Sequence, residues 1–191
     1  SYKDEAKVQE ILESVGKKEG PFGHHVQFFS RLNKDGDQTQ FGTYGFIKHP
    51  PMFIGGVIKN SLEGMVDYGF LFEEVVLRLT DEGLGTVWLG GTFDRTAFQV
   101  KVGFNEVLPA VSPVGYPADA SMRATLENGV KGSRRRKPFG TLFFSGGTLK
   151  PLSKDHPFRP YLEAVRSAPS ASNKQPWRFV VDNETFHLYL K

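Results

Sequence analysis

Cysteine is absent from this chain of 191 residues. Its absence excludes disulfide bonds, thiolate nucleophiles, iron–sulfur clusters and zinc sites with cysteine ligands. A chain without cysteine fits a reducing compartment, and we therefore expect a cytoplasmic protein.

Long apolar runs and an excess of one charge are missing as well. No run approaches the roughly 20 residues of a membrane-spanning helix, and the start, SYKDE, is too charged for a signal peptide, so we expect no membrane partner. The 24 Lys and Arg nearly balance the 21 Asp and Glu, which gives no general reason to bind nucleic acid. The chain begins without Met and stops directly after an alternating run, so we expect that one or both ends have been trimmed.

Familiar catalytic and metal-binding spacings are also missing. The histidines contain no His-x-x-x-His pair, so we predict no metal site. Ser170 lacks the Gly-x-Ser-x-Gly context of a nucleophile, which argues against an acyl-transfer hydrolase. The Asp and Glu residues show no evident pair, although a pair formed only in space stays open.

The sequence does contain interleaved helical and strand patterns, with no linker dividing them. Helical spacing predicts helices over 5–17, 62–82, 94–101 and 157–166. Strands are predicted over 25–32, 52–58, 86–89, 110–116, 177–181 and 185–190, the last two paired as a hairpin. This mixture predicts one α+β domain over residues 1–191, with helices covering a sheet. Because the helix over 62–82 is apolar around most of its circumference, we expect it to be central or at an interface.

Two parts of the chain, 5–32 and 157–190, share a pattern. The sequence Leu-Glu-x-Val at 12–15 recurs at 162–165, and a proline-containing loop and an aromatic-rich strand follow each copy. The pattern is compatible with a weak internal duplication. The alternative is that two unrelated helices share a common spacing.

The segment 168–177, APSASNKQPW, joins a predicted helix to a predicted strand. Pro169 and Pro176 restrict its backbone. Between them lie short polar side chains that can form hydrogen bonds with little loss of entropy, namely Ser170, Ser172, Asn173 and Gln175. This composition predicts a ligand-binding loop.

Glycines punctuate the segment 83–91, GLGTVWLGG. A dinucleotide-binding fold needs a strand, then glycines, then a helix, and the order here is reversed. Gly83 or Gly85 is therefore predicted to end a helix. Gly90 and Gly91 follow the strand and leave two amides unobstructed, which suits a ligand carbonyl or ring nitrogen. A plain turn is the alternative.

The segment 131–138, KGSRRRKP, is the only dense basic cluster. Such a cluster can be a solvated loop, a nucleic-acid or localisation patch, or a phosphate clamp. Only Phe139 stands beside it, so the stacking surface of a single-strand binder is missing. A single phosphate is the better match for these arginines.

Four segments together resemble the FMN-dependent nitroreductase family. They are APSASNKQPW at 168–177, GLGTVWLGG at 83–91, VGYP at 114–117 and RRKP at 135–138. The first of these normally lies near the N-terminus, so the order here resembles the rearranged branch typified by a Thermotoga protein. Members of that branch begin with an Arg-rich segment that binds FMN, and this segment is absent here. Their chains also continue past the point that corresponds to Lys191.

The resemblance implies a three-layer α/β/α fold with a mixed, mainly antiparallel sheet. It also implies an FMN-dependent NAD(P)H oxidoreductase. Proteins of this family are commonly homodimers, so the resemblance implies a homodimer as well. Two electrons pass through flavin N5 to a nitroaromatic, quinone or similar small-molecule acceptor, so no catalytic side chain is expected.

The same resemblance implies which residues bind the cofactor. The flavin and its ribityl chain border Pro169, Ser170, Ala171 and Asn173. The reactive edge of the ring lies over Leu89, Gly90 and Gly91. The phosphate is held by Arg134, Arg136 and Lys137, although the register within the arginines is not settled by sequence.

Three functions follow from these features. The first is the FMN-dependent NAD(P)H oxidoreductase, and the second is an FMN-binding protein with a storage, sensing or other non-reductase role. The third is a nucleic-acid binder that uses residues 131–137, for which binding would depend strongly on salt.

Overall fold

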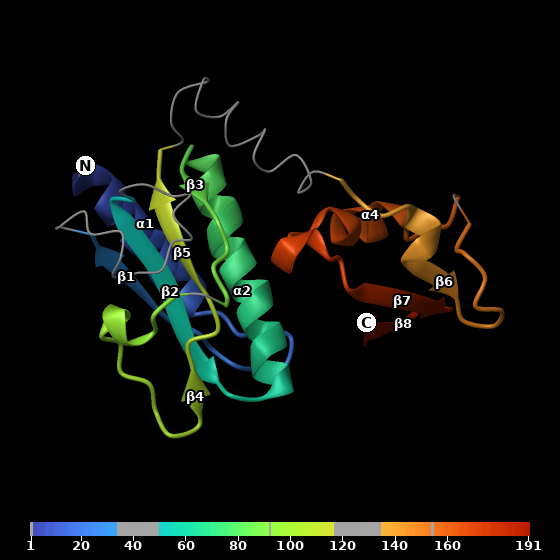
Figure 1. The fold of residues 1–191 in the computed structure, drawn as a ribbon, viewed down its shortest axis with the longest axis horizontal. Coiled ribbons are helices and arrows are strands. Elements are labelled where there is room, and N and C mark those ends of the chain that lie inside the picture. Colours follow the sequence, from blue (N-terminus) through green and yellow to red (C-terminus); the bar gives the residue numbers. More distant parts are fainter. Residues whose placement is uncertain (1, 34–49, 92, 117–134, 154) are drawn as a thin grey trace. The chain divides into compact units, whose positions relative to one another are not determined.

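The computed structural model describes most of the chain, namely residues 2–33, 50–91, 93–116, 135–153 and 155–191. The chain forms two compact units, an N-terminal unit of residues 1–117 and a C-terminal unit of residues 118–191. Each unit has its own sheet and its own hydrophobic core (Figure 1). The predictions of a single domain and of a duplication stay predictions.

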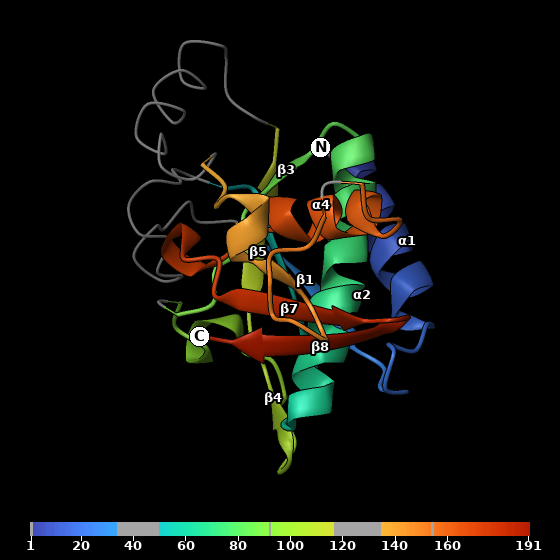
Figure 2. The ribbon, with the colours of Figure 1, turned by 90° about the vertical axis from the view of Figure 1, so that its right-hand side faces the viewer.

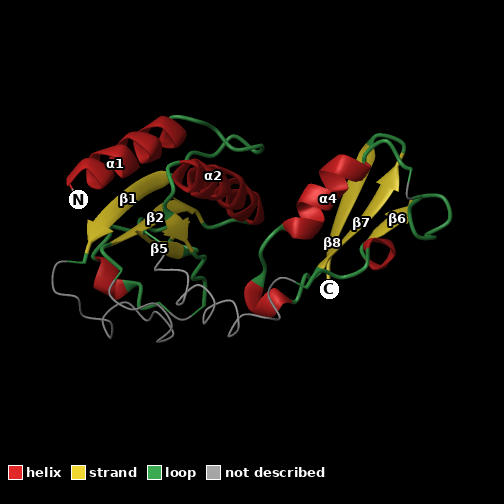
Figure 3. Ribbon diagram, turned by 90° about the horizontal axis from the view of Figure 1, so that it is seen from above, coloured by secondary structure: helices red, strands yellow, loops and turns green. Residues whose placement is uncertain are grey.

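Two helices lie on one face of the N-terminal sheet (Figure 3). They are α1 (Tyr2–Gly16) and α2 (Leu62–Asp81), close to the predicted helices. The helical spacing of α1 turns four apolar side chains inward, where they are buried: Val8, Ile11, Leu12 and Val15. Burial of these side chains, rather than intrinsic helix propensity, therefore holds α1 on the sheet.

The N-terminal sheet has five strands with antiparallel pairing. The strands are β1 (Gln27–Leu32), β2 (Met52–Lys59), β3 (Gly85–Thr86), β4 (Glu106–Val107) and β5 (Val111–Gly115). Their order is β1-β2-β5-β3, and β4 pairs with the end of β2. The central strand β2 is buried along nearly its whole length, which explains its continuous apolar sequence.

Apolar residues of β2 supply both faces of this sheet. Ile54 belongs to the core beneath the two helices, whereas Phe53 belongs to a second core on the opposite face. There Phe53 meets the edge of Phe98, with the ring centroids 5.6 Å apart. Alternating side chains of one strand thus join two cores.

Specific capping groups fix both ends of α2. At its start the Ser61 hydroxyl accepts a hydrogen bond from Gly64 N at 3.1 Å. At its end Gly83 adopts a left-handed φ of 76°, and the amides of Gly83 and Leu84 bond back to the carbonyls of Thr80 and Leu79. This Schellman motif confirms the predicted helix-ending role of Gly83.

The C-terminal unit contains a three-stranded sheet with one helix packed against it (Figure 2). The elements are β6 (Phe143–Ser145), α4 (Arg159–Ser167), β7 (Trp177–Asp182) and β8 (Thr185–Leu190). β6 pairs with β7 in parallel, and β7 pairs with β8 as the predicted antiparallel hairpin. Leu162 of α4 is buried against this sheet and carries the contact.

Two predicted elements differ from the structure, and two strands were not predicted. The strand expected over 86–89 is only the short β3, Gly85–Thr86, followed by an isolated bridge at Leu89. The helix expected over 94–101 is only a 3₁₀ turn, Thr96–Phe98, because Gln99 adopts a left-handed φ of 50° that ends it. The unpredicted strands are β4 and β6, which are too short to show an alternating pattern. Residues 33–40, NKDGDQTQ, whose composition predicts a polar loop, lie outside the described residues apart from Asn33. In the described part of the chain no helix is long and apolar enough to cross a membrane.

Candidate functional site

The segment between α4 and β7 forms a closed loop in the C-terminal unit. After Ser170 the chain makes a 3₁₀ turn, Ala171–Asn173, in which Ser172 and Asn173 have left-handed φ angles of 50° and 52°. The Ser170 carbonyl accepts a hydrogen bond from Asn173 N at 2.9 Å, and its hydroxyl accepts one from Gln175 N at 2.9 Å. Ser170 therefore fixes the loop from inside, as small polar residues do in turns.

The basic segment, Arg135 to Pro138, lies against this loop. The contact is made by the buried Gln175 side chain, whose Oε1 accepts from Lys137 N at 2.7 Å and whose Nε2 donates to Arg135 O at 3.1 Å. The side chain of Asn173 also donates to Arg135 O, at 2.9 Å. Two of the four segments in the resemblance, far apart in sequence, are thus adjacent.

The cations of this segment reach around the loop. Arg136 Nη2 donates to Ser167 O at 2.9 Å, and its Nη1 lies 3.5 Å from Asn173 Oδ1. Lys137 Nζ donates to Lys174 O at 2.7 Å. The predicted phosphate ligands Arg136 and Lys137 therefore lie beside the predicted ribityl contact Asn173, whereas Arg134 is outside the described residues.

One cation beside this cluster was not predicted. Arg166, in the last turn of α4, donates from Nη1 to Lys137 O at 3.3 Å and from Nε to Glu163 at 2.5 Å. A basic residue in a last helical turn is common, so its sequence gives no sign of this contact. The sequence identified Gln175 only as one of several hydrogen-bonding groups, and its burial decides its role.

The predicted ring-binding segment belongs to the N-terminal unit. Leu89 forms an isolated bridge with Val111, with N–O distances of 2.8 and 3.0 Å, and its side chain is buried. Gly90 and Gly91, which follow it, are exposed. A Cβ added at Gly90 would meet no atom within 4 Å. The bridge thus holds Gly90 with open space beside its backbone, and the ligand-binding role of the two glycines stays a prediction.

Trp88 belongs to the core rather than to an open surface. Its ring meets Phe72 edge-on at a centroid distance of 4.6 Å, and its Nε1 donates to Glu73 at 3.0 Å. Tyr68 also packs against it and donates its hydroxyl proton to Ala110 O at 2.5 Å. Burial raises the pKa of Tyr68, so this phenol is a fixed structural donor. The contacts of Trp88 are therefore those of a core residue.

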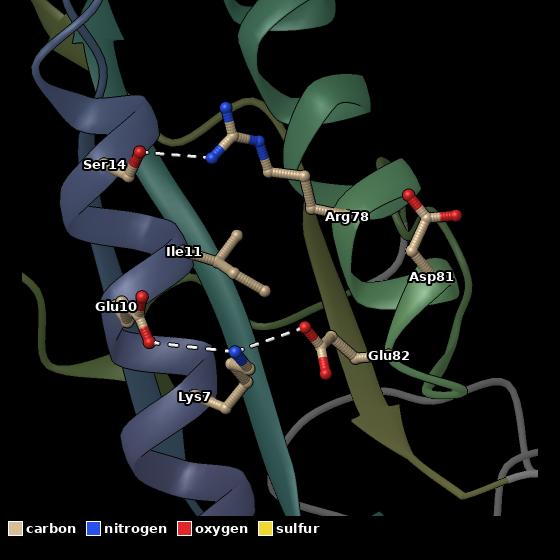
Figure 4. Close-up of a pocket in the computed structure, with 7 residues that line it drawn as sticks. All are labelled: Lys7, Glu10, Ile11, Ser14, Arg78, Asp81 and Glu82. Atoms are coloured by element: carbon tan, nitrogen blue, oxygen red, sulfur yellow. Dashed lines mark hydrogen bonds and ion pairs between the residues drawn. The ribbon is translucent and has the colours of Figure 1, made fainter.

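A polar groove of about 360 Å³ runs along the surface between α1 and α2 (Figure 4). Its lining is Lys7, Glu10, Ile11, Ser14, Arg78, Asp81 and Glu82. Lys7 Nζ lies 3.3 Å from Glu82 Oε1, and Arg78 Nη1 donates to the Ser14 hydroxyl at 3.1 Å. The groove contains none of the predicted site residues, and Lys7 forms ion pairs with two acidic residues that line it, Glu10 and Glu82, so it is a solvated ion-pair surface.

Comparison with known proteins identifies a family and a fold. A family model described as "Putative TM nitroreductase" matches residues 3–190. A crystal structure of a putative nitroreductase from Thermotoga maritima shares 17% identity and superposes with a TM-score of 0.59, over 96% of this chain and 66% of that chain. This chain therefore spans just under two thirds of the length of that protein. The superposition confirms the predicted α+β, nitroreductase-like fold.

Weaker structural matches carry related descriptions. A nitroreductase family protein from Clostridium novyi shares 21% identity over 61% of this chain and 75% of its own, with a TM-score of 0.44. An oxidoreductase described as containing FMN shares 15% identity over 60% and 68% of the two chains, with a TM-score of 0.45. No curated protein matches this chain.

Proposed function

The chain belongs to the nitroreductase family, and we propose that it is an oxidoreductase that binds FMN and uses NAD(P)H as the electron donor. The acceptor in this proposal is a small molecule such as a nitroaromatic or a quinone. The observation that carries the proposal is the adjacency of Arg136 and Lys137 to the loop containing Ser170 and Asn173.

The chemistry of this cluster fits the polar end of FMN. Arg and Lys are the preferred partners of a phosphate, and adjacent residues supply both here. Ser170 and Asn173 supply the hydroxyl and amide groups that a polyhydroxylated chain requires. Small residues such as Ala171 leave room beside the backbone. We therefore assign Arg134, Arg136 and Lys137 to the phosphate, and Pro169, Ser170, Ala171 and Asn173 to the flavin and ribityl chain.

We assign Leu89, Gly90 and Gly91, in the N-terminal unit, to the ring of the flavin, because the two glycines are exposed there. A flat ring can approach Gly90 and Gly91 closely because neither carries a Cβ, and an amide there can donate to a ring nitrogen. Bound FMN supplies two-electron chemistry, so the residues of this chain need only bind and orient it. This division of labour agrees with the absence of a catalytic motif in the sequence.

The proposal includes a homodimer, supported by a surface of α2. This surface, named the α2 apolar stripe, consists of Leu62, Val66, Phe70 and Leu77, which are 74%, 42%, 57% and 57% exposed. Their spacing places them along one side of the helix, opposite the buried side that contains Leu71 and Val75. Aligned exposed apolar side chains are typical of an interaction surface.

Titration with FMN tests the proposal. We expect the protein to quench flavin fluorescence on binding, and the double variant Arg136→Ala, Lys137→Ala to bind FMN about 10- to 100-fold more weakly, because charge-assisted hydrogen bonds are lost. Lys150→Ala, which removes an exposed lysine of the same unit, is the matched control and should bind as the original protein does. Failure of the original protein to bind FMN would refute the proposal.

A further inference from the structure

We propose that Gln175 is a positioning residue that orients the phosphate-binding side of the cofactor site. The inference rests on the proposed function, since it concerns the same site. Gln175 is one of three buried polar or charged residues in the described part of the chain, with only 3% of its surface exposed. A buried amide needs its hydrogen bonds satisfied, and this one has several partners.

The Gln175 side chain forms hydrogen bonds with the backbone on both sides of Arg136. Its Oε1 accepts from Lys137 N at 2.7 Å, and its Nε2 donates to Arg135 O at 3.1 Å. In a β-sheet, a neighbouring strand would bond to the same two groups, the carbonyl before Arg136 and the amide after it. The amide thereby fixes the peptide groups flanking Arg136, and with them the direction in which this cation leaves the backbone.

The same Nε2 also reaches the loop side of the site. It lies 3.2 Å from Asn173 O and 2.9 Å from Asn173 Oδ1. One buried side chain therefore couples the loop position proposed for the ribityl chain to the segment proposed for the phosphate. Cofactor binding depends on such preorganisation, because a misplaced charge must be reordered when the ligand arrives.

Only a neutral amide of this length meets all these requirements. The site needs an acceptor for Lys137 N and an NH2 group whose two hydrogens face the oxygen atoms of Arg135 and Asn173, and Gln175 presents both from one planar group. Methionine has similar length but neither group. Asparagine keeps both groups but is one methylene shorter, so it cannot span the distance from the loop to the basic segment.

The test compares FMN with riboflavin, which lacks the phosphate. Its readout is the ratio of the riboflavin Kd to the FMN Kd, measured by flavin fluorescence. We expect Gln175→Met to lower this ratio about 10-fold, the loss of roughly one charge-assisted contact. The exposed Gln9 of α1 donates a hydrogen bond to Glu13 and accepts one from Ser30 of β1. Gln9→Met therefore makes the same chemical change elsewhere and should leave the ratio unchanged.

The outcomes separate this inference from the proposed function. Thermal unfolding first establishes that each variant is folded. If Gln175→Met does not fold, Gln175→Asn is used in its place. A folded Gln175 variant that keeps the original ratio overturns the positioning role while the proposed function stands. Equal loss of affinity for both flavins overturns it too, since that indicates general damage to the loop. An original protein that binds neither flavin refutes the proposed function itself.

Discussion

His24 Nδ1 lies 2.7 Å from Asp67 Oδ2 within the N-terminal unit. Asp67 is fully buried on α2, and its carboxylate also accepts the backbone amides of Phe22 and His24 at 2.8 and 3.0 Å. Burial alone would raise the pKa of Asp67, but the hydrogen bonds to these amides and to the His24 ring together lower it. The carboxylate thus fastens the loop after α1 to α2.

We predict that this carboxylate makes stability depend on pH in the acid range. Because its folded pKa lies below the unfolded value, the stabilisation is fully present above the unfolded pKa and is lost as pH falls through the folded pKa. Asp67→Asn should remove part of this dependence and destabilise the protein by about 1–3 kcal/mol at neutral pH. Urea unfolding at several pH values measures both effects. Asp81→Asn, exposed on the same helix, should show neither, and equal behaviour of the two variants would contradict the account.

We predict opposite effects of alanine at two glycines of α2. A Cβ at Gly64 would lie 2.2 Å from the carbonyl oxygen of Lys59, so Gly64→Ala must displace backbone and should destabilise the protein by at least about 1–3 kcal/mol. A Cβ at Gly69 meets nothing within 4 Å. Gly69→Ala should stabilise the helix by about 0.5–1 kcal/mol, because alanine has the higher helix propensity. Thermal unfolding of both variants checks the prediction, which fails if their effects share a sign.

We predict that a side chain at Gly90 impairs flavin binding without unfolding the protein. The space around Gly90 is open, so Gly90→Val should keep the fold but obstruct the approach of a ring to the backbone. FMN affinity should fall at least about 10-fold, equivalent to 1.4 kcal/mol. Gly147→Val, at an exposed glycine that is equally open, serves as the control and should retain FMN affinity. Equal FMN affinity of the two variants would remove Gly90 from the site.

We predict that the α2 apolar stripe mediates self-association. Phe70→Lys places a charge on this surface and should shift the protein from dimer to monomer in sedimentation experiments, with its fold intact. Phe104, fully exposed in a loop, offers the same substitution away from the stripe, and Phe104→Lys should not alter the association. A dimer that persists in Phe70→Lys, or a monomeric original protein, contradicts the role of the stripe.

Sequence patterns predicted the elements whose periodicity extends over many residues. Examples are the apolar stripe of α1, the continuous apolar run of β2 and the alternating patterns of the β7–β8 hairpin. Gly83 also predicted the end of α2 correctly. Short elements were missed because their pairing comes from distant segments. β6, for example, spans only Phe143–Ser145 and is defined by its partner β7.

The candidate site was predicted in part. The proximity of Arg136 to Asn173 follows the resemblance, whereas the reason for it, the buried amide of Gln175, depends on contacts across nearly 40 residues of sequence. A glutamine in a polar loop looks no different from a solvated one until its burial is known. The same holds for Asp67, whose position on α2 within an apolar pattern gave no sign of its three donors.

The absorption spectrum of the FMN-loaded protein, recorded anaerobically before and after addition of NADH or NADPH, tests the central claim most directly. An FMN-dependent oxidoreductase should show the oxidised flavin bands and lose them on addition of the nicotinamide, and an acceptor such as a quinone should then restore them. A protein that binds FMN but keeps its oxidised spectrum with both nicotinamides would contradict the oxidoreductase and support a storage or sensing role.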